Sequence, residues 1–316
     1  MRVSVVVPLY NKAAYIRRAL DSIASQTFTG FEVIVVDDGS TDASAGIARD
    51  FPDPRFRLIQ QPNRGPGNAR NRGLAEAKGE LMAFLDADDE WLPNYLEESL
   101  GLLDSSSTDV VSVTSGYFEY PQDTSTEKMW RRLGMTDGPY ETTVYTSPRR
   151  LITVLAYMSP CSTLVRTATV RKYGGFYEGE NCRYGEDAFL WLKVLLHEKA
   201  VFNLKPLVKF HREAASLSKN LRGARPVEPF LTDPERIEAA CPNELRELLA
   251  KFLAARAFKT ACVLGYWGHW SEARTLMQRF KVSGSWRLPY YVPALVCITP
   301  LGANLGRAWR ALLSRS

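Results

Sequence analysis

The first hundred residues alternate between two hydrophobic periodicities, and this alternation restricts the chain to one broad class of fold. Val3–Pro8 is a continuous and mostly β-branched run, which is typical of a strand covered on both faces. A set of apolar residues then recurs at the spacing of one helix face: Ile16, Ala19, Leu20 and Ile23. The scheme repeats, with strands expected at 32–36, at 55–61 and from Glu80, and with helices expected after Asp42, over 67–79 and from Pro93.

Strands and helices that alternate with short connections form right-handed βαβ units on a mostly parallel sheet. We therefore expect an α/β fold. Ligands of such sheets bind beyond the carboxyl ends of the strands. Three polar stretches follow predicted strands and should meet at that edge: "PLYN" (8–11), "DDGSTD" (37–42) and "DADD" (86–89).

In the second half of the chain the alternation of strand and helix patterns is less regular. A strand is predicted at 110–120, a polar loop at 121–143 and a strong helix at 185–200. Beyond about Pro226 no strand pattern occurs, and the sequence predicts two antiparallel helices that turn at "YWGHW" (266–270).

Charge is distributed unevenly behind the net value of +5. Residues 1–100 contain 11 Lys or Arg and 15 Asp or Glu, which suggests a cation site. No acidic residue follows Glu272, whereas seven basic residues do: Arg274, Arg279, Lys281, Arg287, Arg307, Arg310 and Arg315. This basic tail suggests a partner with phosphates or a membrane surface. The apolar stretch 288–305 is interrupted by prolines and is short for a spanning helix, so none is expected there.

The five cysteines are scattered, without a CxxC pair and without a histidine at zinc-ligand spacing, which argues against a zinc site. The start, "MRVSVVVPLYN", has an apolar run that is too short for a signal peptide. We therefore expect free thiols, a reducing compartment and a cytoplasmic location.

The stretch "FLDADDEW" places Asp86, Asp88 and Asp89 at the end of a buried strand, where their carboxylates repel one another. Aspartates at such a junction can simply cap a helix or lie in a solvated turn. Oxygen ligands of this kind also suit Mg²⁺ or Mn²⁺, which take one or two carboxylates together with substrate phosphates. A divalent ion would relieve the repulsion, so we favour a metal site.

Asp37 and Asp38 end the second strand, where they can hold a tight loop or accept hydrogen bonds from a ribose hydroxyl or a base N–H. The chain has neither a GxxxxGK[ST] phosphate loop nor a well-placed GxGxxG. A nucleotide would therefore need carboxylates for its base and ribose and a metal for its diphosphate.

Two further stretches combine helix starts with charged side chains. In "PNRGPGNARNRG" (62–73), glycines let the backbone approach a ligand and three arginines add positive charge, although a solvated arginine-rich helix would look the same. In "YGEDAFLW", Glu186 and Asp187 begin a helix, where acids also stabilise the helix dipole. Neither stretch identifies a ligand alone.

Taken in order, "VSVVVPLYN", "VDDGSTD", "NRGPGNARNRG", "FLDADD" and the later "GGF" and "ED" resemble glycosyltransferase family 2, the inverting nucleotide-sugar transferases with the GT-A fold. The resemblance covers about residues 1–215. It implies a Rossmann-like, mostly parallel sheet flanked by helices, followed here by a helical C-terminal extension. It also implies metal-dependent transfer, with Mn²⁺ or Mg²⁺, from a UDP-sugar to a hydroxyl of a saccharide or lipid-linked saccharide in polysaccharide or glycoconjugate synthesis.

The resemblance also implies roles for residues. The following are expected to bind or line the nucleotide: Pro8, Tyr10, Asn11, Asp37, Asp38, Arg70, Asn71 and Asp86. Within that set, Pro8, Tyr10 and Asp38 match the uracil-binding positions.

The resemblance assigns the chemistry of the reaction to residues in three motifs. Asp86 and Asp88 match the family's DxD motif, with Asp88 as the expected direct metal ligand, and Asp187 matches the catalytic base with Glu186 as its companion. Many relatives carry a Y-R-x-H segment before S-x-S. Alignment on Ser216–Ser218 puts His211 near that place, where it could reach the diphosphate or the metal or be a plain strand residue.

These patterns predict a GT-A catalytic domain at 1–225, with a nucleotide-sugar half at 1–110 and an acceptor half at 111–225, and a helical extension at 226–316. The basic tail also contains aromatic residues: Trp286, Tyr290, Tyr291 and Trp309. It predicts peripheral contact with anionic lipid on the inner face of the plasma membrane, unless it is only a solvated basic end. A nucleic acid partner is not expected, since no recognisable binding motif accompanies the charge.

Two alternatives remain at this point. The acceptor could be polyprenol phosphate, which needs no activated hydroxyl. The chain could also be a non-catalytic module that binds a nucleotide sugar or a glycan and keeps the fold.

Overall fold

The computed structural model describes residues 1–179, 182–214, 225–281, 284, 287–299, 302 and 304. The chain falls into two compact units, one of Met1–Thr142 with Thr153–Ser216 and the other of Thr143–Ile152 with Leu217–Ser316. Several residues that carried sequence predictions lie outside the described part: Ser216–Ser218, Trp286, Arg307, Trp309, Arg310 and Arg315.

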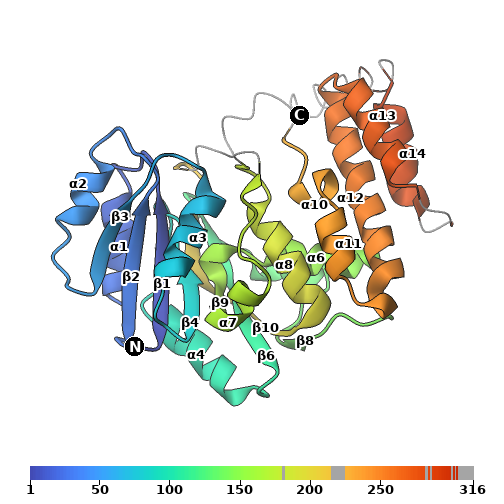
Figure 1. Cartoon of the computed structure of the whole chain (residues 1–316). Coiled ribbons are helices and arrows are strands. Elements are labelled where there is room, and N and C mark those ends of the chain that lie inside the picture. Colours follow the sequence, from blue (N-terminus) through green and yellow to red (C-terminus); the bar gives the residue numbers. More distant parts are fainter. Residues whose placement is uncertain are drawn as a thin grey trace. The chain divides into compact units, whose positions relative to one another are not determined.

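The first unit is built on one sheet, in the order β3-β2-β1-β4-β9-β6-β10-β5, with β7 on β6 and β8 on β10 (Figure 1). The strands in the described residues are β1 (Val3–Leu9), β2 (Phe31–Asp37), β3 (Phe56–Gln60), β4 (Leu81–Phe84), β5 (Glu90–Trp91), β6 (Val110–Tyr120), β7 (Thr124–Ser125), β8 (Gly138–Tyr140), β9 (Thr163–Arg166) and β10 (Lys199–His211).

Parallel pairing dominates the N-terminal part of the sheet. β1 pairs in parallel with β2 and β4, and β2 pairs in parallel with β3. β6 and β10 are also parallel, whereas β5, β7, β8 and β9 run antiparallel to their neighbours. The expected α/β architecture is confirmed. The strand order reverses around β1, so the carboxyl ends of β1, β2 and β4 lie side by side.

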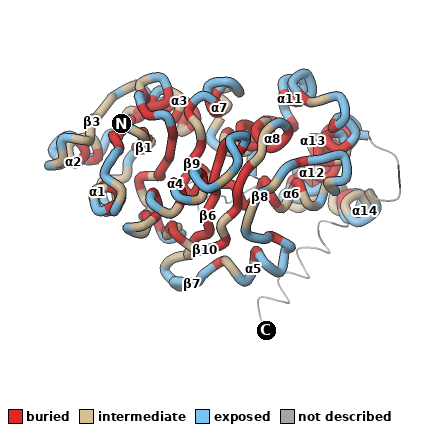
Figure 2. The backbone as a smooth tube through the Cα atoms, turned by 90° about the horizontal axis from the view of Figure 1, so that it is seen from below, coloured by how far each residue is buried: buried red, intermediate tan, exposed pale blue. Residues whose placement is uncertain are grey.

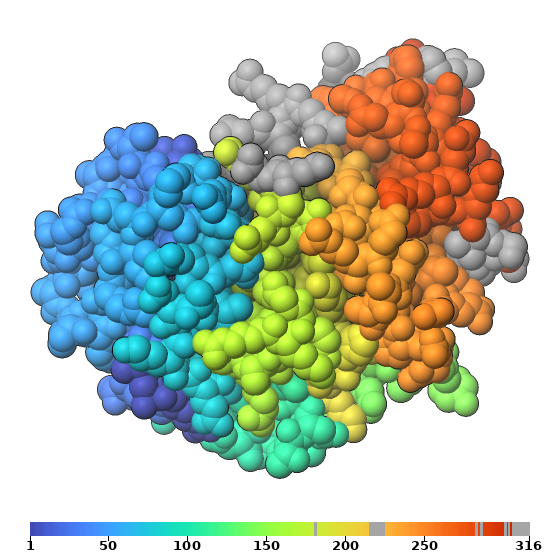
Figure 3. Space-filling model, viewed as in Figure 1, coloured from blue at the N-terminus to red at the C-terminus, as the bar shows by residue number. Residues whose placement is uncertain are grey.

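Helices accompany these strands in the chain up to His197. They are α1 (Ile16–Ala24), α2 (Ser44–Arg49), α3 (Pro66–Glu76), α4 (Tyr95–Ser105), α5 (Glu127–Arg132), α6 (Pro148–Tyr157), the 3₁₀ turn η1 (Pro160–Ser162), α7 (Thr167–Lys172) and α8 (Glu186–His197). One of them, α6, begins in the second unit and ends in the first. The predicted inner face of α1 and all the valines of β1 are fully buried. Figure 2 shows the strands as buried segments among more exposed helices, and Figure 3 shows residues 1–100, blue to cyan, as one continuous packed block.

Two details differ from the sequence predictions. The helix expected over 67–79 ends at Glu76, and Gly79 instead lies against β1, where an added Cβ would be 2.5 Å from the Ser4 nitrogen. The stretch 121–143, expected to be a loop, contains β7, α5 and β8. β7 pairs with β6, β8 pairs with β10, and α5 contacts β10, and local periodicity does not reveal these contacts.

The second unit is helical in its described part. Its helices are α10 (Pro229–Thr232), α11 (Glu235–Ala240), the 3₁₀ turn η3 (Asn243–Leu245), α12 (Arg246–Tyr266), α13 (Trp270–Arg279) and α14 (Leu288–Cys297). α12 and α13 form the predicted pair, and Gly268, with a φ of +91°, lies in the turn between them. None of the described helices combines the length and apolar character that a membrane crossing requires.

Gly73 lets α3 pack directly on β1, because a Cβ at this position would lie 2.4 Å from Cγ1 of Val6. We expect Gly73→Ala to lower the free energy of unfolding by about 1–3 kcal/mol, the usual effect of overpacking a core. Gly101→Ala in α4 is the matched control, since nothing lies within 4 Å of its added Cβ. It should be neutral or slightly stabilising. Urea unfolding measures both variants, and equal losses would contradict the packing argument.

Candidate functional site

The loop after β1 is tied to the loop after β2. Asn11 has a φ of +50°, and its backbone N–H donates to Ser40 Oγ at 3.0 Å. The Asn11 carboxamide oxygen accepts the backbone N–H of Thr41 at 2.8 Å. Tyr10 is 45% exposed beside these contacts, and Pro8 is half-buried in β1. The two loops therefore form a connected rim with an accessible aromatic ring.

Asp37 and Asp38 are buried, and their carboxylates hold the surrounding backbone. Asp38 accepts the backbone N–H groups of Arg64 and Gly65 at 2.9 and 2.8 Å. Asp37 accepts the backbone N–H of Ser40 at 3.0 Å. Both acids stabilise the tight loops at the sheet edge, and a nucleotide contact by either one stays a prediction.

The turn at 86–89 crowds three carboxylates. Lys12 Nζ donates to Asp88 Oδ2 at 2.5 Å and to the carbonyl oxygen of Ala214 at 2.8 Å. Arg18 donates to the carbonyl oxygen of Asp88 at 2.8 Å. Burial and the charge of Asp86 raise the pKa of Asp88, although the Lys12 ammonium opposes the shift. The carboxylates of the turn are therefore not fully compensated by their neighbours.

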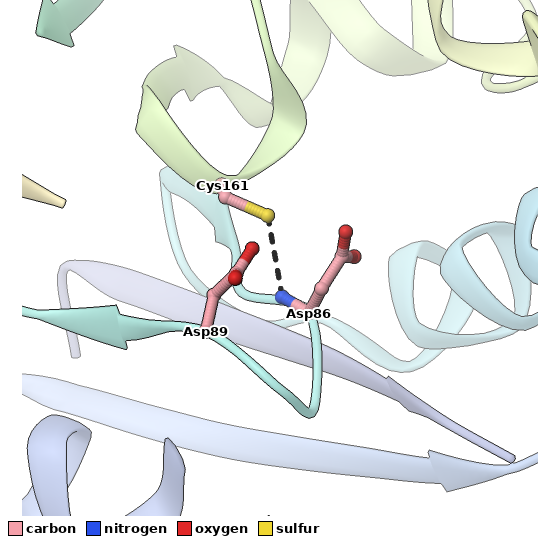
Figure 4. Close-up of side chains that lie close together, drawn as sticks. All are labelled: Asp86, Asp89 and Cys161. Atoms are coloured by element: carbon pink, nitrogen blue, oxygen red, sulfur yellow. Dashed lines mark hydrogen bonds between the residues drawn. The ribbon is translucent and has the colours of Figure 1, made fainter. Parts of the chain in front are cut away.

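Cys161, from η1, directs its sulfur toward this turn, beside Asp86 and Asp89 (Figure 4). Asp89 Oδ1 accepts the backbone N–H of His211 at 2.9 Å. Cys161 Sγ accepts the backbone N–H of Asp86 at 3.3 Å. Burial raises the pKa of the Cys161 thiol well above its usual value, and the charges of Asp86 and Asp89 add to the effect. The thiol therefore stays protonated at neutral pH and packs against the acidic turn.

In the described part of the chain, Asp86, Asp89 and Cys161 place one potential metal-ligand atom each within 4.8 Å of one another. A protonated thiol is a poor ligand for Mg²⁺ or Mn²⁺, so the oxygen atoms of the turn are the fitting donors. The side chains of Asp86 and Asp88 are 37% and 13% exposed. A divalent cation suits this donor set because it would offset the crowded charge. Metal binding by Asp86 and Asp88 stays a prediction.

Arg70 connects the acidic turn to the start of α8. Its Nη2 donates to Asp86 Oδ1 at 2.7 Å, and its Nη1 donates to Glu186 Oε1 at 2.8 Å. The Arg70 side chain is only 5% exposed. Burial lowers the pKa of Arg70, but the charges of Asp86 and Glu186 outweigh burial and raise it. One buried cation therefore joins the predicted DxD motif to the predicted catalytic pair.

Glu186 and Asp187 begin α8 directly after Gly185, whose φ of +75° favours glycine. Glu186 is buried against Arg70, and Asp187 is half-buried. Burial and the charge of Glu186 raise the pKa of Asp187 to about 7, with Arg70 opposing them. A carboxyl group with a pKa near neutrality can take up and release a proton under ordinary conditions.

Asn71 clamps the "GGF" segment that leads toward α8. Its Oδ1 accepts the backbone N–H of Phe176 and its Nδ2 donates to the Phe176 carbonyl, both at 2.8 Å. Gly175 has a φ of +72°, and a Cβ there would lie 2.3 Å from Asn71 Oδ1. α3 thus positions this segment as well as the Arg70 bridge. A contact of Asn71 with nucleotide stays a prediction.

His211 ends β10, and both its ring nitrogens face carboxylates. Nδ1 lies 2.8 Å from Glu213 Oε1, and Nε2 lies 2.6 Å from Glu90 Oε1. The buried ring also packs on Tyr120, with 4.9 Å between ring centroids. A metal contact by His211 stays a prediction, and it would require one of these carboxylates to move.

The sequence patterns did not identify Lys12 and Cys161 as residues of the site. Lys12 directly follows "PLYN", and a basic residue at the carboxyl edge of a strand is the signal that could have marked it. The resemblance implies an acceptor-side loop for "MSPCSTLVRT" (158–167), and the sequence interpretation of Cys161 within it is a packing residue. Cys161 reaches Asp86 from a position 75 residues away in the sequence.

A model of the family described as Glycosyl transferase family 2 matches residues 4–170. Glycosyltransferase GlyA of Streptococcus pneumoniae is 31% identical over 238 residues, which are 69% of this chain and 32% of that protein. Putative glycosyltransferase EpsH of Bacillus subtilis is 46% identical over 100 residues, which are 31% of this chain and 29% of that protein. The chain spans about a third of the length of these relatives.

Solved structures share the fold. TarS 1–349 of S. aureus, in complex with UDP-GlcNAc, gives a TM-score of 0.59 at 24% identity, over 94% of this chain and 80% of that one. The mannosyltransferase PcManGT of Pyrobaculum calidifontis, in complex with GDP-Man and Mn²⁺, gives a TM-score of 0.54 at 19% identity, over 98% and 87%. These matches confirm the expected GT-A architecture.

Proposed function

The chain belongs to glycosyl transferase family 2, and from this premise we propose that it transfers a sugar from a nucleotide donor to an acceptor hydroxyl with inversion at the anomeric carbon. The proposed donor is a UDP-sugar, and the UDP-GlcNAc complex of TarS, which shares the fold, supports that choice. The proposed acceptor is a saccharide or a lipid-linked saccharide in polysaccharide or glycoconjugate synthesis.

The observation that carries this proposal is the Arg70 bridge. It holds Asp86 of the acidic turn and Glu186, the neighbour of Asp187, on one guanidinium group. This bridge supports the proposal because an inverting transfer needs a metal-binding carboxylate near the leaving diphosphate and a base near the incoming hydroxyl, and the residues proposed for these roles are joined by one side chain.

Asp187 supplies the base in this proposal. Its carboxylate accepts the proton of the acceptor hydroxyl while the hydroxyl oxygen forms a bond to the anomeric carbon. The bond from that carbon to the diphosphate oxygen breaks on the opposite face, and its electron pair leaves with the diphosphate. Burial and the charge of Glu186 raise the pKa of Asp187, which makes it a stronger base once it is deprotonated.

Asp86 and Asp88 would hold Mn²⁺ or Mg²⁺, which acts as a Lewis acid on the leaving diphosphate when bound. Arg70 fixes one oxygen of Asp86, and Lys12 fixes one oxygen of Asp88. The protein's own part is to hold the two carboxylates at defined positions.

The proposed binding site for the nucleobase of the donor lies at the joined loops after β1 and β2. Tyr10 offers its exposed ring for stacking beside Pro8, and the backbone around Asn11 and Asp38 is fixed by hydrogen bonds. A site already ordered in this way loses little conformational entropy when a ligand binds.

A donor screen tests the proposal. We expect turnover of at least one of a panel of UDP-, GDP- and dTDP-sugars with Mn²⁺ or Mg²⁺, and loss of turnover when EDTA removes the ion. Asp88→Ala should lower the rate by about 100-fold or more, because a bound metal contributes several kcal/mol at the transition state. Asp104→Ala, which changes a half-exposed carboxylate on α4, is the control and should leave the rate unchanged. No turnover of any donor, or an equally active Asp88→Ala, would contradict the proposal.

The pH dependence gives a separate test. Since only deprotonated Asp187 can accept a proton, kcat/KM should rise about tenfold per pH unit below about pH 7 and level off above it. A rate profile from pH 5.5 to about 8.5 at saturating metal measures this. His211→Asn is the control, because it removes a histidine whose backbone N–H is bonded to Asp89 of the acidic turn. Disappearance of the inflection in that variant would assign it to His211 and contradict the role of Asp187.

A further inference from the structure

The second unit contains a pocket of about 660 Å³ lined by α12, α13 and α14, which lie side by side in Figure 1. One wall of the pocket is apolar and comes from all three helices: Phe258, Met277, Tyr291 and Leu295. Phe258 is fully buried, and Tyr291 packs on it edge to face with 5.1 Å between ring centroids. The wall is therefore packed hydrocarbon at Phe258 and Tyr291, whereas Leu295 is 42% exposed.

Three basic side chains line the same pocket: Arg274, Lys281 and Arg287. No lining residue is acidic, and no Asp or Glu follows Glu272 in the sequence. Within the described ranges, Arg274 and Lys281 form no ion pair, whereas Arg279 on α13 is paired with Glu235 at 2.6 Å. Arg274 and Lys281 thus bring exposed positive charge to the pocket, and Arg287 lies over the Tyr291 ring at 4.9 Å, an arrangement that suits an anionic ligand.

α14 extends the apolar wall beyond the pocket. Four of its aliphatic side chains are 42–51% exposed: Leu288, Val292, Leu295 and Val296. Their spacing puts them on one face of the helix. Single exposed aliphatic residues need no explanation. Four of them in one stripe beside a basic pocket, however, suit a ligand that has both an apolar chain and an anionic group.

We propose that this pocket binds a phosphate-bearing single-chain lipid. The phosphate contacts Arg274, Lys281 and Arg287, and the hydrocarbon chain lies against the apolar wall and the exposed stripe of α14. Inorganic phosphate has no apolar part that could contact the apolar wall of the pocket. Single-stranded nucleic acid would need exposed rings for stacking, whereas Tyr291 is packed edge to face on Phe258. This binding goes beyond the proposed sugar transfer and does not depend on it.

Calorimetry tests the proposal. The full chain is titrated with dodecyl phosphate below the critical micelle concentration of this ligand. We expect saturable binding that weakens about fivefold for Arg274→Ser and for Lys281→Ser, the effect of one cation near an anionic lipid head. Arg246→Ser is the matched control, because Arg246 is exposed on α12 outside the pocket, and it should bind as the unaltered protein does.

A second pair of variants tests the apolar wall. Leu295→Ser should weaken binding several-fold, because it removes apolar surface from the chain site. Val263→Ser is its control, since Val263 is 37% exposed, close to the 42% of Leu295, and lies outside the pocket. The binding of a variant is interpreted only if its thermal unfolding midpoint equals that of the unaltered protein. A loss of folded structure is then not mistaken for a loss of binding.

Three results would overturn the proposal. Inorganic phosphate that binds as tightly as dodecyl phosphate would make the ligand a free anion. Equal weakening by Arg246→Ser would show unspecific attraction by the basic surface. Binding to phosphatidylglycerol vesicles without binding of dodecyl phosphate would show contact with a membrane surface instead of an occupied pocket.

Discussion

Asp187→Asn is expected to lower kcat for sugar transfer by about 10²–10⁴-fold, the usual contribution of a positioned general base. The amide has nearly the shape of the carboxylate but cannot accept the hydroxyl proton. The donor should bind with an unchanged Kd, because Asp187 acts on the acceptor side in the proposed reaction. Initial rates with saturating donor and calorimetric donor binding, measured on the same preparation, separate the two effects.

Asp109→Asn is the control for this substitution, since Asp109 has a 52% exposed side chain paired only at the surface with Lys199. Its rate should stay within about twofold of the unaltered protein, as a surface ion pair contributes little. Transfer that survives in Asp187→Asn would contradict a base at this position. It would favour polyprenol phosphate as the acceptor, because a phosphate oxygen attacks without losing a proton.

Arg70→Met is expected to give the largest loss of stability, about 3–5 kcal/mol in the free energy of unfolding. The reason is that removal of the guanidinium leaves the carboxylates of Asp86 and Glu186 buried or half-buried without their cation. Urea unfolding measures the loss. Transfer activity should fall as well, because the acidic turn and the start of α8 lose their common support.

Arg72→Met is the matched control, since Arg72 lies on the same helix but is 51% exposed and pairs only with Glu76 at the surface. Arg72→Met should lower the free energy of unfolding by less than about 0.5 kcal/mol. The double variant Arg70→Met/Glu186→Gln should recover part of the loss, because it no longer leaves a charged Glu186 without a partner. Equal losses in Arg70→Met and Arg72→Met would contradict the bridging role.

The sheet and its site loops could be predicted from the sequence because the signals are local. The run Val3–Pro8 and the helix face around Ile16 follow from spacing alone. The meeting of 8–11, 37–42 and 86–89 follows from the rule that carboxyl ends of parallel strands share an edge. None of these inferences needs a contact between distant segments.

The contacts that assemble the site could not be predicted in this way. The bond from Arg70 to Glu186 joins residues 116 positions apart, and an arginine in a helix has the same sequence signature whether it is solvated or buried. The same holds for His211, whose two carboxylate neighbours come from separate segments. The strands β7 and β8 within 121–143 were missed because each is stabilised by pairing with another strand, β7 with β6 and β8 with β10.

Helix α3 looks from its composition like a replaceable surface helix, but its contacts imply a narrow tolerance to substitution. Gly67 and Gly73 leave no room for a side chain, and Arg70 and Asn71 are each bound by two separate partners or groups. In a saturation library across this helix, surviving sequences should vary mainly at outward positions such as Arg72. During evolution the helix would therefore change only together with the strand, turn and loop that it contacts.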